Sequence, residues 1–100
     1  MRKVKLVVAN TPESLAETLG LSRAEAQEWQ FQHELLARLK VAIKREGITH
    51  AALAAQAQTS RTRVTAILNG NLEHVSSDLL IRLLGALGYR VRARVSKTAA

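Results

Sequence analysis

The chain has 100 residues, a formal net charge of +7, three aromatic residues and no cysteine. This length fits one domain, residues 1–100, and a core built from Leu, Ile, Val and Ala suits packed helices. The absence of cysteine excludes a disulfide framework and a thiolate metal site. A basic chain usually meets a polyanion, most often nucleic acid, although the charge could also serve solubility alone.

The sequence contains no apolar run that approaches the length of a membrane-spanning helix. Its basic start, followed by the apolar residues 4–9, superficially resembles a secretory signal. However, Lys5 interrupts the apolar run, and no small-residue cleavage site follows. We therefore expect a cytoplasmic protein with no membrane partner.

The N-terminal region, residues 1–22, is expected to hold a short strand and a short helix. Apolar residues alternate along residues 3–9, which predicts the strand. Thr11 is a good helix cap, and the proline after it fits the first helical position, so a helix is predicted over 12–19.

A long helix is predicted over residues 23–46. Ser22 and Glu25 have the spacing of a capping box at its start, and Gly47 fits a left-handed cap at its end. One apolar stripe runs along the helix at intervals of four residues, formed by Phe31, Leu35, Leu39 and Ile43.

The remaining elements complete a helical core over residues 23–88. Two short helices are predicted at 50–57 and 61–68, and a Leu-rich helix begins at Ser76. Apolar residues then alternate with arginines, which predicts a C-terminal strand within residues 89–96. The predicted fold is a mainly α bundle of about five helices with short N- and C-terminal β-strands.

Residues 49–70 carry the most informative pattern. Thr49 and Ser60 can cap the two short helices, with a tight turn between them. Five residues are predicted to face inward: Leu53, Ala54, Val64, Ile67 and Leu68. The residues left outside are Arg61, Thr62, Thr65 and Ala66. Short polar groups and one arginine suit a helix lying in a groove about 12 Å wide, although an ordinary hairpin of amphipathic helices would show the same inward pattern.

This segment resembles the lambda-repressor-like, or Xre, family of helix-turn-helix proteins. The matching residues are Thr49, Leu53, Ala54, Ser60, Val64, Ile67, Leu68, Asn69 and Gly70. His50 stands where the family usually has Gln, and Thr65 stands where Ser is common. Gln58 stands where the turn glycine is usual, so we expect a non-glycine residue with positive φ there, at a cost of about 1 kcal/mol.

The resemblance implies a role in DNA binding for each matching position. The implied base readers are Ser60, Arg61, Thr62 and Thr65, and the implied phosphate contacts are Thr49, His50, Arg63 and Asn69. For Arg63, a solvated surface charge is an equal alternative. The implied partner is double-stranded DNA with an inverted-repeat operator, bound by a homodimer.

No enzyme or cofactor chemistry is expected. The three histidines, His33, His50 and His74, lack metal-ligand spacing, so we predict no metal site. Neither a nucleophile elbow nor a Gly-rich phosphate loop is present, so we predict no catalytic residue and no cofactor-binding residue.

Two features of the flanking segments stay open. Trp29 could mark a partner-binding surface, or it could simply pack the long helix against the short N-terminal one. The arginines of the C-terminal strand, Arg90, Arg92 and Arg94, could contact DNA phosphates or could form a charged edge that blocks unwanted strand pairing.

The flanks resemble HigA-type antitoxins within the family. The similar features are the segment from Leu19 to Ser22, the Leu87-Gly88 pair and the Arg/Val ending. This resemblance implies an autorepressor of its own operon that binds and neutralises a ribonuclease toxin. The alternatives are an Xre regulator without a toxin partner and a protein-interaction module whose basic charge is incidental.

Overall fold

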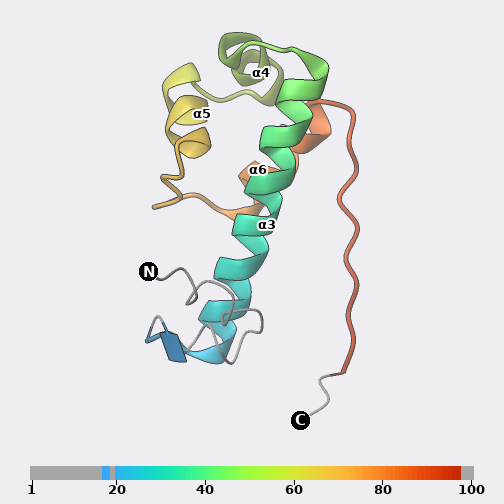
Figure 1. The fold of residues 1–100 in the computed structure, drawn as a ribbon. Coiled ribbons are helices and arrows are strands. Elements are labelled where there is room, and N and C mark those ends of the chain that lie inside the picture. The colour runs from blue at the N-terminus through green and yellow to red at the C-terminus, as the bar shows by residue number, and fades with distance from the viewer. Residues whose placement is uncertain (1–16, 19, 98–100) are drawn as a thin grey trace, which may run out of the picture.

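The computed structural model describes residues 17, 18 and 20–97, and this part of the chain is mainly helical. Its four α-helices are α3 (Arg23–Glu46), α4 (His50–Ala57), α5 (Arg61–Leu68) and α6 (Ser77–Ala86). The long α3 forms the axis, and the three shorter helices gather around its C-terminal half (Figure 1). All four helices lie where the sequence predicts them.

The capping box predicted at the start of α3 is present. The Glu25 N–H donates to Ser22 Oγ at 3.1 Å, and the Ser22 N–H donates to Glu25 Oε1 at 3.0 Å. The backbone hydrogen bond from Ser22, followed by the bond to its side chain, lowers the pKa of Glu25. At the other end, Gly47 adopts φ 66° and donates its N–H to the Ile43 carbonyl at 2.9 Å.

The core lies between α4, α5, α6 and the C-terminal half of α3. The largest fully buried side chains are Leu39, Leu53, Ile67, Leu80, Leu83 and Val64. The apolar stripe of α3 is buried at Leu35 and Leu39, but Phe31 is 37% exposed. The stripe continues past the core because the other described helices surround only the C-terminal half of α3 (Figure 1).

Two side-chain hydrogen bonds join elements that are distant in sequence. Gln32 Nε2, on α3, donates to the Val75 carbonyl at 2.9 Å. Arg82 Nε, on α6, donates to the Ala57 carbonyl at the end of α4 at 3.0 Å. The second bond satisfies a carbonyl of the last turn of α4, which has no N–H donor within its own helix.

The prediction of a C-terminal strand is not confirmed. Residues 89–97 run extended beside α3 (Figure 1), but they form no strand within the described part of the chain. A strand exists only when a second strand shares its hydrogen bonds, and these residues have no such neighbour among those described. The predicted strand 3–9 and most of the predicted helix 12–19 lie outside the described residues, so the count of about five helices and two strands is not reached.

None of the described helices combines the length and the apolar character needed to cross a membrane.

Candidate nucleic-acid interface

Two short capped helices form the candidate site. Thr49 precedes α4, and its Oγ1 accepts the Ala52 N–H at 3.1 Å. Ser60 precedes α5, and its Oγ accepts the Arg63 N–H at 3.1 Å. Both caps were predicted from sequence, and they define where each helix begins, so they set which residues occupy the first turn of α5.

The turn between α4 and α5 also has the predicted conformation. Gln58 is left-handed, with φ 59° and ψ 48°, and it closes the C-terminus of α4. The Thr59 N–H donates to the Ala54 carbonyl at 2.9 Å, so the chain reverses within a few residues. A glycine would adopt this conformation without a Cβ clash, and glutamine adopts it at a cost.

The inward side of α5 is firmly anchored. Val64 and Ile67 are fully buried, and they belong to the same core cluster as the buried Leu53 and Ala54 of α4, the helix that α5 packs against. Small Ala54 allows the two helices to cross closely. With two buried anchors one turn apart, α5 has one rotational setting about its axis, and this setting fixes which side chains point outward.

Arg61 and Thr62 occupy the outward side of the first turn of α5, together with the exposed cap Ser60. The described part of the chain offers no salt-bridge partner to Arg61. Its guanidinium therefore has all its donors available for an external acceptor. Short side chains around one free arginine leave the helix backbone close to whatever surface approaches it.

The structure brings His50 and Thr65 together. His50 Nδ1 and Thr65 Oγ1 share a 2.9 Å hydrogen bond that ties the first residue of α4 to the middle of α5. Thr65 is half-buried, so its hydroxyl is already engaged. His50 keeps its second ring nitrogen for an outside partner, and the bond orients the ring. Sequence reasoning assigned both residues to DNA but did not predict this contact.

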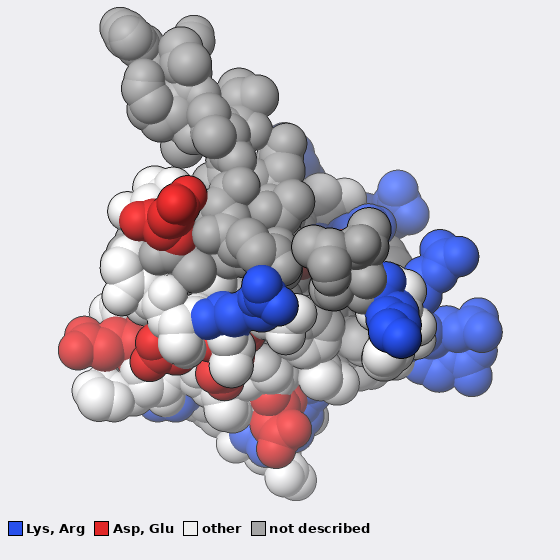
Figure 2. All heavy atoms as spheres, turned by 90° about the horizontal axis from the view of Figure 1, so that it is seen from below, with Lys and Arg blue, Asp and Glu red and all other residues white. Residues whose placement is uncertain are grey.

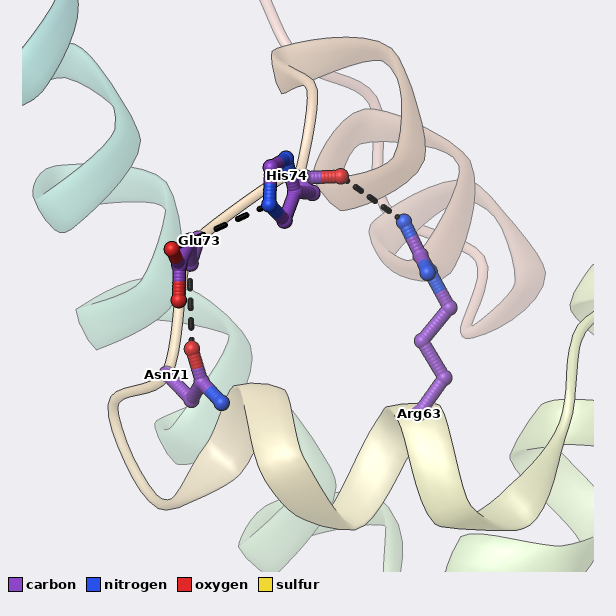
Figure 3. A network of polar contacts seen from close by, with 4 residues as sticks. All are labelled: Arg63, Asn71, Glu73 and His74. Atoms are coloured by element: carbon purple, nitrogen blue, oxygen red, sulfur yellow. Dashed lines mark hydrogen bonds and ion pairs between the residues drawn. The ribbon is translucent and has the colours of Figure 1, made fainter.

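Arg63 points to the loop that follows α5 (Figure 3). Its Nη2 donates to the His74 carbonyl at 3.0 Å. The His74 backbone is left-handed, with φ 61°, and its Nε2 lies 3.8 Å from Glu73 Oε2. The Glu73 N–H in turn donates to Asn71 Oδ1 at 3.2 Å. Arg63 therefore braces this loop, and because it is exposed its remaining donors still face solvent.

A shallow hollow of about 330 Å³ lies beside α5. Its lining includes Ser60, Thr62 and Arg63 on one side and Asn71 and Glu73 on the other. Asn69, the last predicted phosphate contact, is exposed at the C-terminal end of α5. The residues predicted to contact DNA thus lie mainly in three places: the start of α4, the start of α5 and the end of α5.

Part of the positive charge of the chain lies away from the candidate site. In Figure 2, most Lys and Arg side chains on the visible face gather on the side where the C-terminal segment runs in Figure 1. That segment carries Arg90, Arg92 and Arg94, and it lies across α3 from α5 (Figure 1). Within the described residues, no group of three His, Cys, Asp or Glu side chains could hold a metal ion.

A family of helix-turn-helix domains matches residues 18–96 of the chain. This protein belongs to that helix-turn-helix family. Its structure is also similar to a solved structure provisionally described as an XRE-family transcriptional regulator. That match has a TM-score of 0.66 and 32% sequence identity, and it covers 75% of this chain and 84% of the other. The second match supports the Xre family. No curated protein matches the chain.

The helix-turn-helix domain contains contacts that sequence reasoning missed. Arg82 and Gln32 had no role assigned, yet each donates to a backbone carbonyl of another element. No sequence pattern predicts such bonds, because the acceptor is a backbone carbonyl and every residue type has one. For His50, the departure from the family's usual Gln was visible, but its partner Thr65 was not.

The strained turn generates a prediction about stability. Replacing Gln58 by glycine removes the Cβ from a left-handed residue, so we expect the free energy of unfolding to rise by about 0.5–1 kcal/mol. Chemical denaturation of the two proteins measures the change. Gln56→Gly is the matched control, since it lies inside α4 and should lower stability by about 1 kcal/mol. Equal losses in the two variants would contradict the assignment of strain to Gln58.

Proposed function

We propose that this protein is a sequence-specific DNA-binding transcriptional repressor that places α5 in the major groove. The observation that carries the proposal is the outward face of α5. Arg61, which has no ion-pair partner among the described residues, and exposed Thr62 lie there on a helix anchored by two buried residues. A rigid helix with short polar side chains is what the width of the major groove admits.

Base reading is assigned to the first turns of α5. Arg61 has the geometry to donate two hydrogen bonds to guanine O6 and N7, and the Thr62 methyl group suits a thymine methyl. The Ser60 hydroxyl is a cap that can still donate to a base. Thr65 acts beside them, with its hydroxyl oriented by His50 at 2.9 Å.

Phosphate binding is assigned to the ends of the two helices. Thr49 and His50 lie at the start of α4, where unpaired backbone N–H groups attract an anion. Arg63 and Asn69 extend the contact along α5. Glu73 lies near this path, and its negative charge would limit how closely phosphate approaches the hollow beside α5.

The proposed repressor acts as a homodimer on an inverted repeat with half-sites about one helical turn apart. One motif offers three or four base readers, each contributing about 1–3 kcal/mol of discrimination. That total is small against the many competing genomic sites, and a second motif doubles it.

A more specific proposal follows from the resemblance of the flanks to HigA-type antitoxins. In this form the protein represses its own operon and neutralises a ribonuclease toxin. It is supported by the segment from Leu19 to Ser22 and by the Leu87-Gly88 pair before the Arg/Val ending. An Xre regulator without a toxin is the alternative, and it predicts the same DNA binding.

Base reading by Arg61 predicts a position-specific effect. Arg61→Ala should relax preference at one operator position, at about 1–3 kcal/mol, because a bidentate contact distinguishes guanine from the other bases. Competition binding against all four bases at each operator position measures this. Arg45→Ala, at the exposed end of α3, is the control that should leave the profile unchanged. If Arg61→Ala keeps the base preferences of the parental protein at every operator position, Arg61 is not a base reader.

Phosphate binding by Arg63 predicts a uniform effect. Glutamine at this position keeps a polar side chain but carries no charge. Arg63→Gln should therefore weaken binding to operator and random DNA alike, and should make the salt slope shallower by about one unit. Arg63→Lys keeps the charge and should keep the slope. If the glutamine variant loses affinity for the operator alone, the phosphate assignment is wrong.

The toxin proposal is tested with the product of the adjacent gene. Co-expression of the two proteins should give a complex that survives gel filtration, and the partner's RNA cleavage should stop when this chain is added. Arg61→Ala should leave both results unchanged, because the base reader is not assigned to the protein contact. Two proteins that elute separately would favour the regulator without a toxin.

A further inference from the structure

The C-terminal segment, residues 89–97, is an extended chain with an open edge. Its first residue is fixed, since the Tyr89 N–H donates to the Leu84 carbonyl at 3.0 Å and the Tyr89 hydroxyl donates to Glu46 at 3.1 Å. Beyond it, no backbone hydrogen bond joins residues 90–97 to any other described residue. A row of unpaired N–H and C=O groups on an extended chain is a template for another strand.

The apolar side chains of this segment divide into two groups. Tyr89 and Val91 are half-buried and pack against the core of their own chain. Val95 is 93% exposed, and Ala93 beside it is exposed too. The second half of the segment therefore carries apolar residues that its own described chain does not cover.

An open groove of about 620 Å³ lies between this segment and α3. Its apolar lining includes Phe31, Leu35, Leu84 and Val91, and Phe31 is 37% exposed. The groove also borders the unpaired backbone of the segment. It thus offers an apolar floor and a hydrogen-bonding edge together, which is the arrangement that accepts an added strand.

We propose that the occupant of this groove is the same segment of a second copy, paired antiparallel about a two-fold axis at Ala93. This inference rests on the homodimer of the proposed function and assigns its surface. An axis at Ala93 keeps the apolar residues of the two copies on the same side of the pair. It also places Val95 of each copy opposite Val91 of the other, at the apolar groove.

The groove is lined by four arginines, Arg38, Arg90, Arg92 and Arg94, and by one carboxylate, that of Glu34, so only Glu34 attracts an arginine of the second copy. Glu34 of α3 lines the groove, and its carboxylate lies 4.0 Å from Arg38, a long and exposed ion pair. An arginine arriving from the second copy therefore meets a carboxylate that is only weakly engaged. The contact is reciprocal, because a two-fold axis gives each copy the same groove and the same segment.

The two-fold pairing also brings like charges together. In an antiparallel pair that is symmetric about one axis, residues of the same parity lie opposite each other, so Arg92 of one copy faces Arg94 of the other. Like charges directly opposite oppose pairing, and on exposed side chains salt screens them. Dimerisation should therefore strengthen with salt, the reverse of DNA binding.

The second copy lies away from the candidate DNA-binding surface. In Figure 1 the segment runs on the opposite side of α3 from α5. Dimerisation through this segment therefore leaves Arg61 and Thr62 of both copies uncovered. It also gives a role in assembly to Arg90, Arg92 and Arg94, which are exposed but lie away from α5.

Single cysteines test the register, because the chain has none of its own. Ala93→Cys lies on the axis and should form an intermolecular disulfide under mild oxidation, since opposed residues lie within disulfide reach. Val95→Cys is the matched control. It is also exposed, but in this register it lies several residues away from Val95→Cys of the other copy, so it should form little disulfide. Equal cross-linking of both variants, or none at Ala93→Cys, would overturn the proposed register.

Charge reversal tests the surface. A triple variant, Arg90→Glu, Arg92→Glu and Arg94→Glu, places unlike charges opposite each other only when it pairs with the parental chain. In native mass spectrometry of an equal mixture, mixed dimers should exceed their statistical proportion. The control triple variant Lys40→Glu, Lys44→Glu and Arg45→Glu has the same net charge, and its mixed dimers should stay near that proportion. A statistical mixture from both variants would overturn the proposal.

Sedimentation without DNA completes the test. The parental dimer should tighten by about threefold between about 50 mM and about 500 mM salt, because screening reduces the repulsion between arginines. A chain that stays monomeric, or a dimer that weakens with salt, contradicts the assigned surface. These readouts use no DNA, so they are independent of the Arg61 result. A dimer that forms without the Ala93→Cys disulfide would keep the homodimer but exclude this surface.

Discussion

The contact between α4 and α5 is the constraint on which the function depends. Leu53 and Ala54 on one helix and Val64 and Ile67 on the other are all buried in one core cluster, and the two helices pack against each other. Removing apolar surface from water at this crossing leaves α5 one orientation about its own axis. The outward position of Arg61 follows from that orientation. The helix proposed to read bases would thus owe its precise position to apolar packing on its opposite side.

Around this apolar contact, polar side chains act as a second layer of support. His50 is bonded to Thr65 across the two helices, and Arg63 is bonded to the His74 carbonyl of the following loop. Each of these residues also has donors or ring atoms left for an outside partner. The groups that position their neighbours and the groups proposed to contact DNA are therefore not separate sets in this domain. A substitution at His50 or Arg63 is expected to change both properties.

The C-terminal segment shows a different use of the same physical rules. The helices satisfy their own backbone hydrogen bonds, whereas residues 90–97 leave theirs open among the described residues. Alternating Val and Arg gives the segment one apolar and one charged side. The apolar side favours association, and the charged side opposes self-pairing at low salt. In the proposed dimer, this balance would give assembly and DNA binding opposite dependence on ionic strength.

The sequence by itself determined the elements whose signals are local. Caps at Ser22, Thr49 and Ser60, the left-handed Gln58 and the inward residues of α5 all follow from residue type and spacing within a few positions. Tertiary structure alone decided the bonds from Gln32 and Arg82 to distant carbonyls, because a backbone acceptor has no sequence signature. It also decided that residues 89–95 form no strand within the described chain: alternation specifies two faces, but a strand needs a hydrogen-bonding neighbour that no local pattern supplies.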